Sequence, residues 1–321
     1  MTKYIIDTDT ASDDAVALIM ALRDPTCDVV AITTVAGNVS LEQATKNALI
    51  SVEMSGVTPP PVYKGIGKPL VRDQINATHV HGMDGLGDVG YPDPKLQIEE
   101  EHAVPAMLRT IRECDTDIEL ITLGPLTNVA VAMMRDMETM KKLRRIVIMG
   151  GAQLGYNART DCAEFNILCD PEAANVVFQS GIPIVMVPLE VCCGETKDIM
   201  ADTEITEEEQ AMVKGFGNPV ADFVIDCNCK LRETTLYRVK RATITLPDPT
   251  TVAVALRPGL VEESYPCNVV VDTSGSLTYG QTVIIPPTGS LHVEKTDKCN
   301  VTVVAKLDGQ GFKDYLFSLI R

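Results

Sequence analysis

The chain has 321 residues, and its 44 Asp and Glu side chains outnumber its 28 Lys and Arg side chains, which gives a formal net charge of −16 at pH 7. Nucleic acids and anionic membranes are bound by basic surface, so this charge excludes both as expected partners. Hydrophobic residues make up 45% of the chain, enough for a large buried core and too many for a disordered protein. No apolar run is long enough to span a bilayer, and Asp7 interrupts the N-terminal apolar segment too early for a signal peptide, so a cytoplasmic protein is expected.

The ten cysteines follow no metal-binding spacing. No Cys-x-x-Cys pair is present, and Cys227-x-Cys229 has no second pair downstream. A zinc cluster or a disulfide framework is therefore not expected, and small buried thiols in a reducing compartment are the favoured interpretation.

The first half of the chain alternates predicted strands and helices. Ser12 is predicted to cap the first helix, with Asp13 and Asp14 in its positive first turn, and Ser40 with Gln43 forms a capping-box pattern at the second. A Gly-rich stretch from about residue 65 to 94 has no periodicity and is predicted to be a loop near the ligand site. The predicted strands are Lys3–Ile6, Val29–Val35, Ile118–Leu123 and Arg145–Met149. The predicted helices run from Ser12 to about Arg23, from Ser40 to about Met54, near Ala103–Cys114, and, after a turn at Gly124-Pro125, to about Met134.

The second half continues the pattern with a helix that begins at Asp170-Pro171 and a strand over Ile184–Val187. Residues 204 to 241 are predicted to be helical, and the C-terminal part is predicted to hold strands Asn268–Val271 and Asn300–Lys306 and a final helix. Repeated strand–helix units with buried strands predict the α/β class. We expect a single large domain over residues 1–321, with a mostly parallel central sheet and helices on both faces.

The end of the first predicted strand is unusually acidic. Asp7, Asp9, Asp13 and Asp14 lie within eight residues, at the carboxyl end of a strand, where parallel sheets bind their ligands. Four carboxylates this close raise each other's pKa, and a bound cation removes that conflict. Because the donors are hard oxygens with no Cys or His beside them, Ca²⁺ or Mg²⁺ is favoured over zinc.

The pattern from Asp7 to Ala11 is similar to the DxDx[TV] signature of haloacid dehalogenase-like phosphatases. In that family one aspartate attacks phosphorus and Mg²⁺ bridges the phosphate. The later acidic motif and the phosphate-binding lysine of that family have no convincing counterpart in this sequence.

A second resemblance extends much further along the chain. The segment Asp7-Thr8-Asp9 with Asp13-Asp14-Ala15 resembles the N-terminal signature of the inosine-uridine nucleoside hydrolase family. The later blocks that match, in family order, are Thr33-Thr34-Val35-Ala36-Gly37-Asn38-Val39, His81-Gly82-Met83-Asp84-Gly85-Leu86-Gly87, Leu123-Gly124-Pro125-Leu126-Thr127-Asn128, Met149-Gly150-Gly151, Ala163-Glu164-Phe165-Asn166 with Asp170-Pro171-Glu172-Ala173-Ala174, and Asp248-Pro249.

The resemblance implies a ribonucleoside N-ribohydrolase, which releases ribose and a free base. It implies a Ca²⁺ cofactor held by Asp9, Asp14, the main-chain carbonyl of Leu123 and Asp248, with the ribose 2′- and 3′-hydroxyls and one water as further ligands. Asp9 would deprotonate that water, which then attacks the anomeric carbon. A homodimer or homotetramer is implied as well.

The remaining site residues follow from the same resemblance. Asp13 would accept a hydrogen bond from the 2′-hydroxyl, and His81 would contact the base as a catalytic residue. Tyr237 belongs to the segment that covers the base in relatives, as do Arg232, Glu233 and Arg241. The other implied substrate-binding residues are Asn38, Met149, Asn157, Glu164 and Asn166.

Two positions depart from the family pattern. Pro247 stands where many members carry a histidine that protonates the departing base. Ala158 stands where the asparagine for the 5′-hydroxyl is usual, with Asn157 one residue earlier. Three functions therefore remain open: a Ca²⁺-dependent ribonucleoside hydrolase, a phosphatase with Asp7 as nucleophile, and a non-catalytic nucleoside- or sugar-binding protein on the same scaffold.

Overall fold

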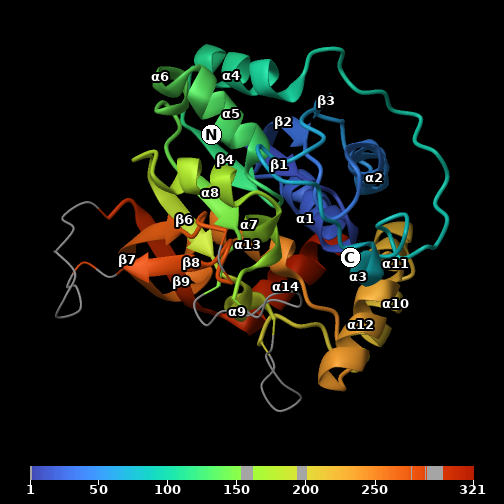
Figure 1. Cartoon of the computed structure of the whole chain (residues 1–321). Helices are drawn as coiled ribbons and strands as arrows, with labels where there is room; N and C mark the ends of the chain where they lie inside the picture. Colours follow the sequence, from blue (N-terminus) through green and yellow to red (C-terminus); the bar gives the residue numbers. More distant parts are fainter. Residues whose placement is uncertain (1, 153–161, 194–200, 276, 286, 288–298) are drawn as a thin grey trace.

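The computed structural model describes residues 2–152, 162–193, 201–275, 277–285, 287 and 299–321 (Figure 1). Within these residues nine strands form one sheet in the order β3-β2-β1-β4-β5-β6-β9-β7-β8. Neighbours from β3 to β9 pair in parallel, whereas β7 pairs antiparallel with both β9 and β8. The strands are β1 (Lys3–Thr8), β2 (Asp28–Thr34), β3 (Val62–Lys64), β4 (Ile118–Thr122), β5 (Ile146–Met149), β6 (Ile184–Val187), β7 (Val261–Val271), β8 (Thr282–Ile285) and β9 (Val301–Leu307).

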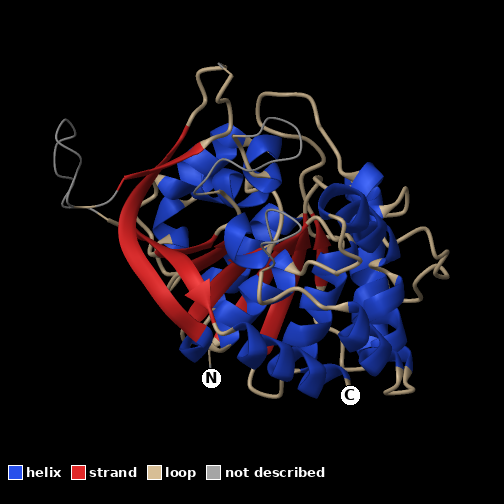
Figure 2. Ribbon diagram, turned by 90° about the horizontal axis from the view of Figure 1, so that it is seen from below, coloured by secondary structure: helices blue, strands red, loops and turns tan. Residues whose placement is uncertain are grey.

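The helices cover both faces of this sheet, so the predicted α/β class is confirmed (Figure 2). Those of the first half are α1 (Ser12–Arg23), α2 (Leu41–Ser55), α3 (Thr78–His81), α4 (Ala103–Glu113), α5 (Thr127–Arg135), α6 (Met137–Met140), α7 (Phe165–Cys169) and α8 (Pro171–Phe178). Those of the second half are α9 (Leu189–Cys192), α10 (Glu207–Lys214), α11 (Pro219–Asp226), α12 (Cys229–Val239), α13 (Pro247–Leu256), the 3₁₀ turn η1 (Pro258–Leu260) and α14 (Gly309–Ile320). Among the described residues, no helix combines the length and the apolar character that a bilayer crossing requires.

Alternation along the central strands divides the core into two hydrophobic clusters. Ile6 of β1 and Ile121 of β4 belong to the cluster under α1 and α13, whereas Ile5 and Leu120 belong to the cluster under α4 and α5. Successive side chains of a strand point to opposite faces, so a strand buried on both faces is apolar at every position. This is why these strands are recognisable as continuous Ile, Leu and Val runs.

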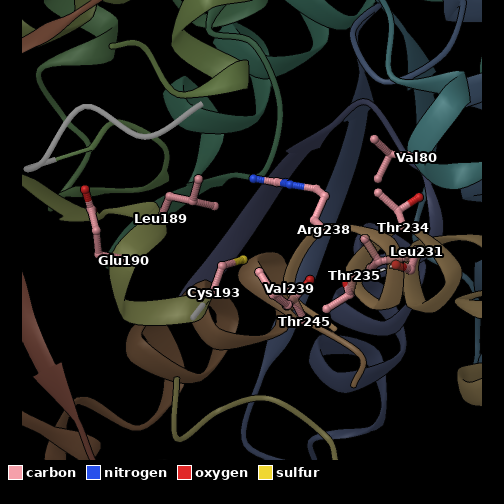
Figure 3. Close-up of a pocket in the computed structure, with 10 residues that line it drawn as sticks. All are labelled: Val80, Leu189, Glu190, Cys193, Leu231, Thr234, Thr235, Arg238, Val239 and Thr245. Atoms are coloured by element: carbon pink, nitrogen blue, oxygen red, sulfur yellow. Dashed lines mark hydrogen bonds between the residues drawn. The ribbon is translucent and has the colours of Figure 1, made fainter. Parts of the chain in front are cut away.

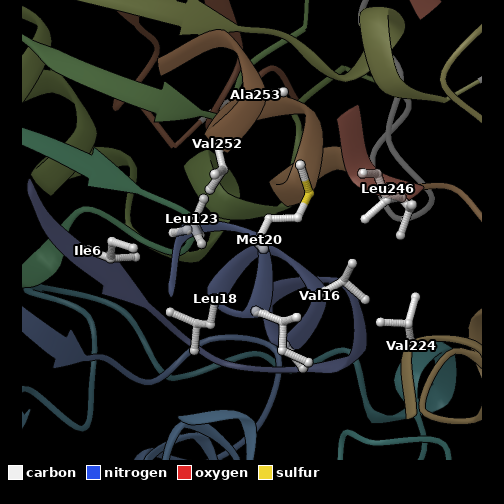
Figure 4. Packing of buried hydrophobic residues seen from close by; sticks show 14 of the residues in the cluster. Ile6, Val16, Leu18, Met20, Leu123, Val224, Leu246, Val252 and Ala253 are labelled. Atoms are coloured by element: carbon white, nitrogen blue, oxygen red, sulfur yellow. The ribbon is translucent and has the colours of Figure 1, made fainter. Parts of the chain in front are cut away.

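Helix α1 lies at the centre of the first cluster and carries the acidic segment at its N-terminus. Its residues from Ser12 to Ala21 are all buried, as expected for a helix that is covered on every side. Figure 4 shows Val16, Leu18 and Met20 of α1 among side chains of β1 and α13. The first turn of α1 therefore enters the ligand site from a rigidly packed helix.

Several element boundaries differ from the predicted ones. Ser40 caps α2 as predicted, since its side chain accepts a hydrogen bond from the backbone N–H of Gln43. The predicted cap at Ser12 is wrong, because Ala11 occupies the N-cap position and Asp14 accepts the backbone N–H of Ala11 instead. Helix α13 was not predicted, although a proline in the first helical turn is a recognised start signal. Strand β7 is longer than predicted because exposed charged residues interrupt the apolar pattern of its first half.

The strand order reverses direction at β1, which has β2 on one side and β4 on the other. In open α/β sheets the crevice for ligands forms at such a switch point, outside the carboxyl ends of the strands. The turns after β1, β2 and β4 therefore meet there.

Candidate active site

Asp9, directly after β1, is enclosed by two glycine turns. Its Oδ2 accepts a hydrogen bond of 2.6 Å from the backbone N–H of Asn38, while Oδ1 is buried and has no hydrogen-bond partner among the described residues. A Cβ on Gly37 would lie 2.1 Å from Oδ2, and one on Gly124 would lie 2.5 Å from Oδ1. Only glycine fits at either turn while Asp9 keeps this position. Burial, followed by the charge of Asp14, raises the pKa of Asp9 well above its ordinary value.

Asp13 and Asp14 enter the same region from the first turn of α1. Oδ1 of Asp14 accepts the Thr8 hydroxyl at 2.6 Å, and its Oδ2 accepts the backbone N–H of Ala11 at 2.9 Å, so this carboxylate holds the turn between β1 and α1. Oδ1 of Asp13 is buried without a hydrogen-bond partner in the described part of the chain. Burial raises the pKa of each of these two carboxyls to about 6.

Asp248 completes an acidic cluster from the opposite side, in the first turn of α13. Carboxylate oxygens of Asp13, Asp14 and Asp248 all lie within 4.8 Å of one another. Burial and then the charges of Asp14, Asp13 and Asp9 raise the pKa of Asp248 well above its ordinary value. This cluster is suitable for a hard divalent cation, because its donors are hard oxygens and a cation would relieve the repulsion between the carboxylates. Such an ion could also meet the unpaired oxygens of Asp9 and Asp13. Asp13, which the resemblance assigns to the ribose, is part of the cluster.

Asp7 is not part of the acidic cluster and instead connects elements of the sheet. Its Oδ1 accepts the hydroxyl of Thr33 at 2.5 Å and the side-chain N–H of Asn128 at 2.8 Å, which joins β1 to β2 and α5. Burial raises the pKa of Asp7 to about 7. Asp7 lines neither cavity at the site, an arrangement that suits support of the neighbouring turns.

The turn into α7 provides the polar residues of the other wall. Glu164 is the N-cap of α7, and its carboxylate accepts backbone N–H groups of Asn166, Ile167 and Gly151 at 2.9–3.2 Å. The Asn166 side chain donates to the carbonyls of Leu123 and Met149, at 2.8 and 3.2 Å. Burial raises the pKa of Glu164 to about 7. Glu164 and Asn166 are two residues apart, a spacing that is also typical of alternating residues on a strand. Here the two residues instead begin a helix, with Glu164 as its N-cap.

His81 lies at the end of α3 and faces the acidic turn. Its Nδ1 is 2.8 Å from the hydroxyl of Ser12 and 3.7 Å from Oδ1 of Asp13. Burial lowers the pKa of His81 to about 4, so the imidazole is neutral near pH 7. With Nδ1 engaged by Ser12, Nε2 is the ring nitrogen left for a ligand.

A cavity of about 160 Å³ connects most of the predicted site residues. Two predicted residues are not part of it: Tyr237 is 80% exposed on the outer face of α12, and Asn157 lies outside the described residues. Asp9 and Asp14 lie beneath the cavity surface. The predicted residues that line the cavity are Asp13, Asn38, His81, Leu123, Met149, Glu164, Asn166 and Asp248.

Comparisons with known proteins agree with this arrangement. Residues 4–314 match the family model described as inosine-uridine preferring nucleoside hydrolase. The pyrimidine-specific ribonucleoside hydrolase RihA of Escherichia coli O7:K1 (strain IAI39) is 38% identical over 99% of this chain and 97% of its own length. The chain belongs to the inosine-uridine nucleoside hydrolase family.

Solved structures of nucleoside hydrolases share the fold over nearly the whole chain. The plant nucleoside hydrolase PpNRh1 superposes with a TM-score of 0.89 at 29% identity, covering 99% of this chain and 98% of its own. A purine-preferring ribonucleoside hydrolase from Gardnerella vaginalis gives 0.86 at 30% identity, with the same coverage. The resemblance found in the sequence is thus confirmed, and the chain is an enzyme of the ribonucleoside hydrolase class.

A second cavity of this nucleoside hydrolase, of about 110 Å³, adjoins the first and shares part of its wall. Figure 3 shows Val80, Leu231 and Thr234 on one side and Leu189 on the other, with Arg238 extending between them. Tryptophan is absent from the sequence, and none of the described residues that line this second cavity is aromatic.

Sequence reasoning missed two polar groups of this nucleoside hydrolase site. Ser12, predicted to be a helix cap, contacts His81. Arg238 lines the second cavity but is not one of the residues predicted in its segment, which are Arg232, Glu233, Tyr237 and Arg241. Helical spacing offered a signal for Arg238: Leu231, Thr234 and Thr235 recur at intervals of three and four residues before it and share its face.

Proposed function

We propose that this nucleoside hydrolase splits the N-glycosidic bond of ribonucleosides, with Ca²⁺ as its cofactor and Asp9 as general base. The observation that carries the proposal is the group of four buried carboxylates at the floor of the cavity, Asp9, Asp13, Asp14 and Asp248. Two of their oxygens, Oδ1 of Asp9 and Oδ1 of Asp13, have no hydrogen-bond partner among the described residues. A buried, unpaired carboxylate oxygen is costly unless a cation or a ligand meets it.

The proposed metal ligands are Asp9, Asp14, Asp248 and the main-chain carbonyl of Leu123. Ca²⁺ accepts six to eight oxygen ligands in flexible geometry, which suits carboxylates that come from a strand end and from two helix starts. When bound, the ion would supply positive charge that holds the ribose diol and acidifies a water molecule.

The protein's own groups perform the remaining steps of this proposal. Asp9 takes the proton of the attacking water. Because Gly37 and Gly124 pack closely against the Asp9 carboxylate, its position and orientation are fixed. Asp13 accepts the 2′-hydroxyl. Asn38, Met149, Glu164 and Asn166 hold the rest of the ribose, and Asn157 is proposed for the 5′-hydroxyl on the resemblance alone.

His81 is proposed to contact the base as a neutral hydrogen-bond donor through Nε2. Ser12 can donate its hydroxyl proton to Nδ1, which places the ring proton on Nε2. An imidazole whose pKa is lowered to about 4 by burial donates a hydrogen bond without carrying a charge at neutral pH.

The test is a comparison of metal content and ribose release for the wild type, Asp9→Ala and Asp93→Asn. Asp93 is an exposed aspartate paired with Lys46, so Asp93→Asn is a matched control outside the site. We expect calcium by elemental analysis in the wild type and the control, and loss of ribose release with reduced calcium in Asp9→Ala. A wild type that binds uridine or inosine for hours without releasing reducing sugar would instead support the non-catalytic binding protein.

Deoxyribonucleosides separate hydrolysis from phosphatase chemistry. A 2′-deoxyribonucleoside lacks the hydroxyl proposed to meet Asp13 and the metal, so its turnover should nearly vanish. A phosphatase would release phosphate from a 5′-monophosphate whichever sugar is present. Assembly as a homodimer or homotetramer is proposed from the family relationship, and light scattering on the purified chain tests it.

A further inference from the structure

The base end of the site has one permanent positive charge. Among the described residues that line the two cavities, Arg238 is the sole Lys or Arg. Its neighbours in the second cavity are apolar side chains, hydroxyl and thiol groups, and one carboxylate, that of Glu190. Pro247, beside the acidic cluster, has no proton to donate. A base that departs into this space therefore has the Arg238 guanidinium as its one permanently charged donor among the described lining residues.

Arg238 is available for a ligand, unlike the other arginines of its segment. Arg232 lies 3.9 Å from Glu207, and Arg241 lies 3.0 Å from Glu204, so both have acidic partners. Within the described part of the chain, Arg238 has no ion pair and no hydrogen bond from its side chain. Figure 3 shows its side chain extended into the cavity in the direction of Leu189.

We propose that Arg238 receives the departing base, by donating hydrogen bonds to a carbonyl oxygen of the base as the glycosidic bond breaks. The inference rests on the proposed hydrolase function and names the residue that replaces the missing acid. A guanidinium carries several N–H donors and no acceptor, so it favours bases that present carbonyl oxygens, such as uracil and hypoxanthine. Adenine presents an amino group on the corresponding edge and is expected to gain much less.

The step balances without a further reactant. The water oxygen forms the new bond to C1′, and its proton passes to Asp9. The electron pair of the C1′–N bond moves to the base nitrogen and delocalises onto the carbonyl oxygen, where Arg238 donates. The base anion then takes a proton from solvent, and Asp9 returns its own to solvent, so one water is consumed for each ribose and base formed. Donors aimed at developing negative charge lower the barrier because the charge is smaller in the ground state.

The experiment compares Arg238→Gln and Arg238→Lys with Lys230→Gln on two substrates. Lys230 is on the same helix and its exposed side chain pairs with Glu233, so Lys230→Gln is the matched control. Uridine has a poor leaving group, whereas 4-nitrophenyl β-D-ribofuranoside releases a phenolate that is stable without a partner. We expect Arg238→Gln to lower kcat/KM for uridine by about 30- to 100-fold and for the nitrophenyl riboside by less than about threefold. Arg238→Lys should recover part of the loss, and Lys230→Gln should match the wild type.

Two outcomes overturn the inference. Unchanged uridine hydrolysis by Arg238→Gln would show that Arg238 does not meet the base. Equal losses on both substrates would assign Arg238 to folding or to the ribose rather than to the leaving group. In either case a wild type active on uridine leaves the hydrolase function standing, whereas a wild type inactive on both substrates removes that function itself.

Discussion

Replacement of Gly124 by alanine tests whether the position of Asp9 governs catalysis. A Cβ on Gly124 would lie 2.5 Å from Oδ1 of Asp9, closer by about 0.9 Å than the 3.4 Å at which ordinary contact begins. Asp9 cannot withdraw without losing its 2.6 Å hydrogen bond from Asn38, because Gly37 closes the other side. A displacement of about 1 Å at a reacting group lowers the rate by roughly 100-fold, or about 2.7 kcal/mol in the barrier.

The assay is kcat/KM on uridine together with the thermal unfolding midpoint of each variant. Gly259→Ala is the matched control, since a Cβ at Gly259 meets no atom within 4 Å and its φ is negative or extended. We expect Gly124→Ala to fold and to lose about two orders of magnitude in kcat/KM, while the control retains the wild-type value. Wild-type activity in folded Gly124→Ala would refute the argument that Asp9 must stay where the two glycines place it.

Three further predictions concern substrate and stability. A nucleoside should be hydrolysed with a kcat/KM more than about tenfold above that of its 5′-monophosphate, a difference of about 1.4 kcal/mol in transition-state free energy. The reason is that aspartates line the proposed ribose end, whereas Arg238 lies at the proposed base end, and equal kcat/KM values would contradict this prediction. The buried Glu164 has its pKa raised to about 7 from 4.5, so the folded state binds more protons than the unfolded state between those values, and stability falls as the pH rises through them. Urea unfolding from pH ~5 to ~8 should therefore show a shallower decline for Glu164→Gln than for the wild type, and parallel slopes would exclude this cause. Asp24→Ala should lower the free energy of unfolding by about 2 kcal/mol and leave kcat/KM unchanged. The reason is that the buried Asp24 carboxylate pairs with Arg257 and accepts a hydrogen bond from the Tyr315 hydroxyl, and neither partner lines the cavity. A loss of stability below half that value would show that these contacts are dispensable.

The part of the site that we propose to hold ribose was predictable because its residues lie at the ends of predictable strands. Asp9, Asn38 and Leu123 follow short apolar strands and Met149 ends one, and a parallel sheet brings such ends to one edge. Asp248 was assigned through family resemblance alone, since the helix that carries it begins with Pro247 and has no apolar stripe of its own. A helix buried on nearly every side shows no periodic pattern, so local sequence reasoning did not find α13.

The base end was less predictable because it depends on the rotation of one helix about its axis. Tyr237 and Arg238 are adjacent in sequence, and neighbours on a helix point about 100° apart, so only one of them can face the cavity. Leu231, Thr234 and Thr235 mark the inward face of α12 only weakly among its charged residues, and Tyr237 is the residue that the resemblance implies. The 80% exposure of Tyr237 and the cavity position of Arg238 show which face of α12 is inward. Ser12 illustrates the same difficulty, because a helix cap and a first-turn residue differ by one position.

Under the proposed function, the two ends of the site differ in how freely they can change. The ribose end is built from strand ends and glycine turns, where Gly37 and Gly124 leave no room around Asp9 for change. The base end is built from faces of α3, α9 and α12, where a residue can be exchanged without moving the sheet. A substitution at position 238 should therefore alter the choice of base while leaving the handling of ribose intact. That separation is why the nitrophenyl riboside, which keeps the sugar and changes the leaving group, isolates the contribution of Arg238.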